Sequence, residues 1–277
     1  MKSALLLATA FVCFLHPSDP AELVSRQTVG DVFEEKESSW SSSSTSAAAE
    51  EENRPSFGAN IGSEGARSFV AIVERHRTIL DEVLAVSDGR RTKVKRTYLV
   101  STSSAADASS AEPTPRLQSA AFEGQTVVLV ADGDGTRIVG EIDGEEELGA
   151  SDRSLTSRWE LLLPGRPVAI GESWSLSEDV SKRLLEGLDV ARASASCTLD
   201  GVDAKAAGKP ARIKIDIQAT GAGEAGSDIH ATGEVLWSTG SDHLVEAALT
   251  ARIHTVLPDL REENGEFRVR YEVAKLE

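Results

Sequence analysis

The stretch LLLPGRPVAIGESW, residues 161–174, separates two differently patterned halves of this 277-residue chain. Pro-Gly at 164–165 and Gly171 predict two turns, and Trp174 is a large apolar anchor. The residues before this stretch predict irregular hairpins and helices, whereas those after it alternate regularly. We therefore expect the stretch to join the two halves and to organise both of them.

The clearest pattern lies downstream. Ser177 is a good N-cap for a helix that runs to about Leu185. Apolar and polar residues then alternate through five strands joined by short turns, which predicts an antiparallel meander with one face in solvent. The inward rows of this meander are rich in small residues: Ala191, Ala193, Ala195, Ala231, Gly233, Ala247 and Ala251.

Upstream, residues 69–83 carry apolar side chains at helical spacing, which predicts a helix. A second, short helix is predicted over 151–163. A strand at 91–102 and a hairpin of residues 126–131 and 136–142 complete the expected elements. The predicted fold is mainly β (α+β), a curved antiparallel sheet or half-barrel with two or three packed helices.

The N-terminus has the pattern of an export signal. Lys2 precedes an uninterrupted apolar run from Ala4 to Leu15, which is too short to span a bilayer. We predict a signal peptide over 1–20, and hence an exported protein, periplasmic or extracellular, with no transmembrane span after signal removal. Residues 21–60, rich in Ser, Ala and Glu, predict a disordered linker. A single β-rich domain would then occupy 61–277.

The charge of the chain restricts its partners. A net charge of −16 disfavours nucleic acid and anionic membrane surfaces, because both require Lys and Arg to replace counterions. No HExxH, CxxC, GxSxG or phosphate-binding loop occurs in the sequence. We therefore predict no catalytic residue, no cofactor and no metal, although an enzyme built on scattered carboxylates stays open.

One acidic stretch resembles a calcium loop in part. Asp132, Asp134 and Asp143 occupy its first, third and twelfth positions, but Arg137 stands where glycine is needed. A hairpin turn explains the same residues, and we prefer that interpretation.

Residues 162–174 also carry a family resemblance. The pattern LLP-x-x-P-V-x-x-G-E-S-W resembles a motif of exported bacterial β-rich proteins of unknown function, many of which have Asp where this chain has Glu172. The resemblance implies a secreted β-rich protein without an assigned activity. The expected helices and meander are more loosely similar to the lipoprotein-carrier fold, in which a curved sheet cups helices over an apolar cavity.

The small inward residues predict unfilled volume, which close packing does not tolerate. One of the chain's own helices, an apolar small molecule or a partner protein of the cell envelope would occupy it. We therefore predict a non-enzymatic binding module whose ligand contacts Ala231, Trp237, Ala247 and Leu249. The alternatives are a structural or interaction protein of the cell envelope with a self-filled core, and a carboxylate-based enzyme.

Overall fold

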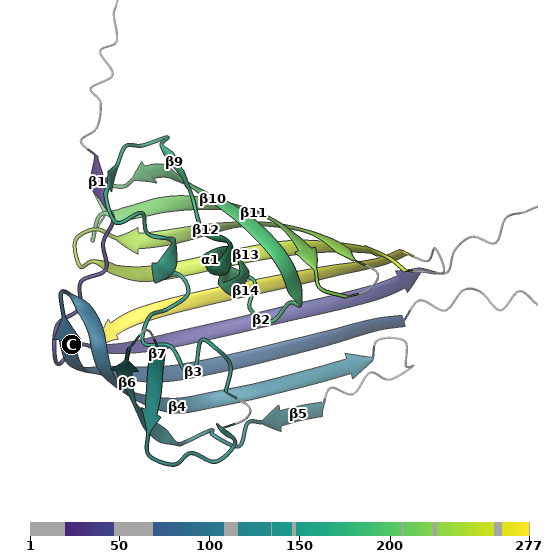
Figure 1. Cartoon of the computed structure of the whole chain (residues 1–277), viewed down its shortest axis with the longest axis horizontal. Coiled ribbons are helices and arrows are strands. Elements are labelled where there is room, and N and C mark those ends of the chain that lie inside the picture. The colour runs from purple at the N-terminus through teal and green to yellow at the C-terminus, as the bar shows by residue number, and fades with distance from the viewer. Residues whose placement is uncertain are drawn as a thin grey trace, which may run out of the picture.

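The computed structural model describes residues 20–46, 69–107, 116–133, 135–145, 148–206, 208–223, 226–257 and 262–276. Over these residues the chain is mainly β, as predicted, and one long antiparallel sheet curls strongly without closing on itself (Figure 1). Residues 1–19, which hold nearly all of the predicted signal peptide, lie outside the described residues.

The large sheet has the strand order β7-β6-β4-β3-β2-β14-β13-β12-β11-β10-β9, and β5 pairs with β4 beside this path. A second, two-stranded pairing joins β1 to β8. The bounds are β1 Ala21–Glu22, β2 Val32–Ser46, β3 Phe69–Ser87, β4 Arg90–Asp107, β5 Arg116–Ser119, β6 Thr126–Asp132, β7 Gly135–Val139, β8 Pro167–Val168, β9 Ser173–Ser175, β10 Val190–Val202, β11 Pro210–Gly221, β12 Ser227–Ser238, β13 His243–Val256 and β14 Glu262–Leu276.

The predicted C-terminal meander is confirmed as β10 to β14, each strand antiparallel to the next. Alternate residues of β11 are buried and exposed along the strand, as a sheet with one solvated face requires. One detail differs, because a register shift between Leu236 and Trp237 turns Leu244 inward and leaves Val245 exposed. The predicted strand at 91–102 and the 126–142 hairpin are also confirmed, as β4 and β6–β7.

The linker predicted for 21–60 is wrong for the residues that are described. Strand β2 lies inside the large sheet, paired with β14 on one side and β3 on the other. The composition of β2 concealed the strand, because serine and glutamate occupy inward positions where a strand normally has apolar residues. Glu35 is almost fully buried and accepts a hydrogen bond from Tyr271, which no compositional rule anticipates.

The helix predicted for 69–83 is also wrong, since this segment forms strand β3 between β2 and β4. Its apolar residues occupy both faces of the strand, and that distribution imitated helical spacing. Inward positions such as Arg77 and Asp81 are charged, so the two-residue alternation was hidden. Pairing on both sides decides the conformation here, because tertiary context overrides local pattern.

The prediction of two or three helices is not met by the described residues, which contain one α-helix, α1 (Glu178–Leu184). Ser177 caps it as predicted, accepting a hydrogen bond from the Val180 backbone N–H. The helix predicted for 151–163 is instead a series of turns ending in one 3-10 turn, Glu160–Leu162. Its apolar residues Leu155, Trp159 and Leu162 are nevertheless buried.

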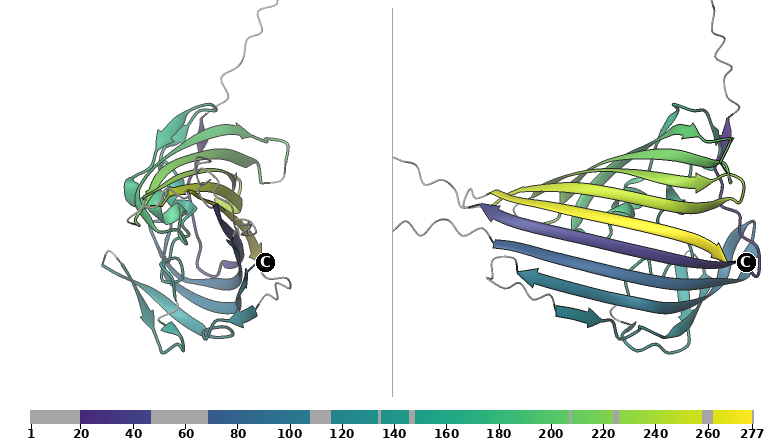
Figure 2. Two further views of the ribbon diagram at one scale, coloured as in Figure 1. Left: turned by 90° about the vertical axis from the view of Figure 1, so that its right-hand side faces the viewer. Right: turned by 180° about the vertical axis from the view of Figure 1, so that it is seen from behind.

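Residues 148–172 and 177–187, the second range including α1, form a layer that we call the cover. Trp159 and Leu162 of the cover and Leu184 of α1 belong to the same buried cluster as the inward residues of β10 to β14. Figure 2 shows the sheet as an open curve with α1 at its open side. No helix in the described part of the chain combines the length and apolar character needed to cross a membrane.

Candidate functional site

The concave face of the sheet is the face on which Val269, Ser39 and Arg75 lie, in one cross-strand row. The polarity of its side chains changes across the width of the sheet. On β10 to β14 it is apolar and packs against the cover. On β2 to β4 it carries buried or half-buried charges. The buried and half-buried charged groups of the concave face therefore lie on its second part.

The four residues predicted to contact a ligand belong to the apolar part. Ala231, Trp237 and Ala247 are 0% exposed and Leu249 is 1% exposed, all within one continuous core cluster. The structure brings them together under the cover, and none of them lines the polar cleft described below. A ligand would reach them only if the cover moved.

One of the small inward residues has a local explanation. A Cβ on Gly233 would lie 2.5 Å from the carbonyl oxygen of Ala248 and 2.9 Å from a methyl carbon of Leu249. Glycine here permits close approach of two strands, so its size reflects packing between β12 and β13 rather than vacant volume.

A cleft of about 390 Å³ opens between the polar part of the concave face and the cover. Sites for small molecules commonly fall between about 300 and 1,000 Å³. Strands β2, β3, β4 and β5 supply one wall and the cover supplies the other. The polar residues of its lining include Glu37, Ser39, Arg75, Arg77, Ser103 and Arg158.

Ion pairs fix the inner end of this cleft. Arg77 on β3 donates to Glu37 on β2 at 3.1 Å and also donates to the carboxylate of Asp152 in the cover. Arg158, also from the cover, lies 3.2 Å from the other carboxylate oxygen of Glu37. Burial alone would raise the pKa of Glu37, but Arg158 and Arg77 outweigh it and hold this pKa below its ordinary value. Glu37 is therefore a fixed anion and a poor proton donor.

A second network lies deeper, beneath the cover. Asp81 pairs with Arg96 and lies 3.3 Å from Arg91, while Arg91 also lies 3.5 Å from Glu160. Burial raises the pKa of Glu160, although Arg91 opposes the shift. These pairs connect strands β3 and β4 to the 3-10 turn, so they position the cover over the sheet.

The 162–174 motif serves the same purpose at the sheet edge. The Trp174 Nε1–H donates to the carbonyl oxygen of Leu162 at 2.8 Å. The Glu172 carboxylate accepts from the Ala169 backbone N–H at 2.9 Å and from Arg166 at 2.6 Å, and these hydrogen bonds lower its pKa. Gly171 has φ +85°, a conformation suited to glycine. The motif thus fastens the cover.

The cleft residues were not predicted, because a helix over 69–83 would have Arg75 and Arg77 on its polar side. The pattern that could have indicated a strand is a two-residue period through Val73, Arg75, Arg77, Ile79 and Asp81. Apolar and charged residues alternate irregularly along it, so the period was not evident. In the part of the chain that the structure describes, no group of three or more His, Cys, Asp or Glu side chains could hold a metal ion. Asp132 of the calcium-like stretch lies 3.5 Å from Arg137, and Asp134 lies outside the described residues.

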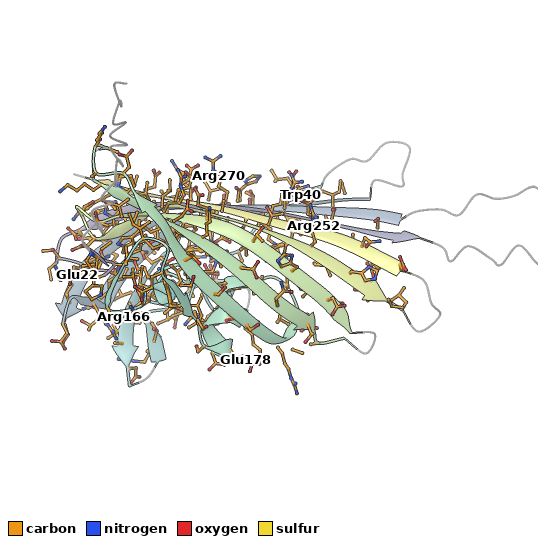
Figure 3. All side chains as sticks on the ribbon, turned by 90° about the horizontal axis from the view of Figure 1, so that it is seen from above. Glu22, Trp40, Arg166, Glu178, Arg252 and Arg270 are labelled. Carbon is orange, nitrogen blue, oxygen red and sulfur yellow. The ribbon has the colours of Figure 1, made fainter. Side chains whose placement is uncertain are left out.

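In Figure 3, Trp40, Arg252 and Arg270 lie on one side of the sheet, and Arg166 and Glu178 of the cover lie toward the other. The first three belong to the convex, solvated face, and Trp40 there stacks with Arg268 at 5.0 Å.

Neither a protein-family model nor a curated protein matches this chain.

Proposed function

We propose that this chain is an exported binding module that holds a small polar ligand in the concave cleft. The observation that carries the proposal is a cavity whose charged walls are already fixed by ion pairs among Glu37, Arg77, Asp152 and Arg158. Preorganised polar groups lower the cost of ordering on binding. Export rests on the apolar run from Ala4 to Leu15.

The ligand in this proposal is polar, unlike the apolar molecule expected from the sequence. Leu184 and Leu185 of the cover are fully buried against the apolar part of the concave face, together with Ala231 and Ala247. The chain's own residues thus supply the packing that an apolar ligand would otherwise provide.

A structural or interaction protein of the cell envelope is the second candidate. The same self-filled apolar face favours it, because the described core needs no ligand to complete its packing. A binding module and a structural protein differ in one measurable respect, which is saturable stabilisation by a small polar compound.

Thermal unfolding of the full chain tests the proposal against a panel of glucose, trehalose, glucuronate, citrate and glycine betaine. A compound that binds only the folded state stabilises it by about 2.7 kcal/mol at a hundredfold excess over Kd. We expect at least one compound to raise the Tm. Ser103→Phe, which places a ring in the cleft from β4, should abolish the shift, whereas Thr250→Phe on the convex face should preserve it.

No Tm shift with any compound, or an equal shift in Ser103→Phe, would contradict the cleft as a binding site and favour the structural alternative. Export has its own test, which is N-terminal sequencing of the protein from its native cells. A mature N-terminus near residue 21 is expected, and cytosolic protein that retains Met1 would exclude export.

A further inference from the structure

We infer that the ligand carries an acid group and that Arg75 on β3 recognises it. This inference rests on the proposed function of the cleft and names the class of ligand. Two adjacent cross-strand rows on the concave face provide the comparison. One row is Glu37, Arg77 and Ser101, and the next row is Ser39, Arg75 and Ser103.

The two arginines differ in their partners. Arg77 is neutralised by Glu37 and by Asp152. Arg75 is exposed in the cleft, and no described residue forms a hydrogen bond or ion pair with it. Glu37 is the neighbouring carboxylate that feels its field, but one Glu37 oxygen pairs with Arg77 and the other with Arg158. Within the described ranges, Arg75 is thus the arginine of the cleft without an ion-paired carboxylate.

The chemistry around Arg75 indicates the remainder of the ligand. Directly opposed residues on neighbouring strands have Cβ atoms about 5 Å apart, so the Ser39 and Ser103 hydroxyls flank the Arg75 position. Ser119 and Gln118 add further uncharged polar groups to the lining. Among the described residues, none hydrogen-bonds the side chains of these four.

A guanidinium binds a carboxylate through two parallel hydrogen bonds, and serine hydroxyls both donate and accept. A polyhydroxylated organic acid, of the sugar-acid class, satisfies both sets of groups at once. Its carboxylate would lie against Arg75, and its hydroxyls would bond to the serines. A simple inorganic anion would use the charge alone.

Isothermal titration calorimetry of the full chain tests this with D-glucuronate, D-glucose and sulfate. We expect glucuronate to bind more tightly than either of the others. Arg75→Gln should weaken glucuronate binding at least tenfold and leave any glucose binding unchanged. Arg252→Gln, which removes an exposed arginine from the convex face, should leave glucuronate binding intact. Thermal unfolding of each variant without ligand should stay close to the wild type, because neither arginine forms a hydrogen bond or ion pair with a described residue.

Several results would overturn the inference. Equal glucuronate affinity in the wild type and Arg75→Gln would remove Arg75 from recognition. Sulfate binding as tight as glucuronate would mean that the site selects charge and not a sugar acid. Stabilisation by a neutral compound of the panel, lost in Ser103→Phe, together with no glucuronate binding, would overturn the acid group and leave the proposed binding function standing. No binding by any compound would overturn both.

Discussion

Asp81 and Arg96 face one another across β3 and β4 and form a paired ion contact that is almost completely withdrawn from solvent. The Arg96 Nε donates to Oδ1 at 2.8 Å and the Nη2 donates to Oδ2 at 2.6 Å, with side chains 4% and 0% exposed. Arg96 also donates to the carbonyl oxygens of Ser151 and Asp152. One guanidinium therefore connects two strands and the cover.

Removal of one partner should destabilise the fold strongly, because an unpaired buried charge is left behind. Asp81→Ala should lower the free energy of unfolding by about 3–5 kcal/mol, measured by urea denaturation. Glu82→Ala is the matched control, since Glu82 and Lys95 form an exposed pair at 3.2 Å on the same two strands. That control should cost less than about 1 kcal/mol. Similar losses in both variants would contradict a special role for the buried pair.

The two buried glutamates should give opposite pH dependences of stability. Burial raises the pKa of Glu160 above its ordinary 4.5, so the unfolded chain loses this proton first as pH rises. Relative to Glu160→Gln, the wild type should therefore lose stability above pH 4.5. The pKa of Glu37 is lowered instead, because Arg158 and Arg77 outweigh its burial. Relative to Glu37→Gln, the wild type should lose stability as pH falls below 4.5. Urea denaturation across pH 3–8 checks both signs, and the same sign for both variants would contradict the assigned environments.

The apolar part of the concave face should tolerate no added volume. Ala231→Leu should cost about 1–3 kcal/mol in urea denaturation, because Ala231 is fully buried beneath the cover. Ala248→Leu, at an exposed position on β13, should change stability by less than about 0.5 kcal/mol. Unchanged or higher stability in Ala231→Leu would indicate a vacant cavity and would support an apolar ligand.

The Trp174 indole should contribute to the attachment of the cover at the sheet edge. Trp174→Phe keeps an aromatic ring but removes the hydrogen bond to the Leu162 carbonyl. We expect a loss of about 0.5–1.5 kcal/mol and faster amide exchange in residues 160–172. Trp40→Phe, on the convex face, serves as the control and should leave exchange of the cover unchanged. Unchanged exchange in Trp174→Phe would mean that the cover is held by other contacts.

The C-terminal half was predictable because its inward residues are apolar and its outward residues are polar. Ile213, Ile215 and Ile217 on β11 illustrate this, since each is buried and each polar neighbour is exposed. Ser177 was likewise identifiable as a cap. In such segments local pattern and tertiary environment agree.

Strands β2 and β3 were not predictable for the opposite reason. Glu35, Asp81 and Arg96 point inward and are buried, and the cost of burying each one is offset by a partner on a neighbouring element. A single sequence gives no indication that Tyr271 lies against Glu35, 236 positions earlier. These strands form one wall of the cleft, so the role of Arg75 and Arg77 was not predicted. The expected ligand was placed against the apolar meander instead.

A crystal structure of the full chain grown with saturating glucuronate would test the assignment of the cleft most directly. We expect the ligand between β3, β4 and the cover, with its carboxylate within hydrogen-bonding distance of the Arg75 guanidinium and its hydroxyls near Ser39 and Ser103. An empty cleft, or ligand found against Ala231 and Trp237 with the cover displaced, would contradict it.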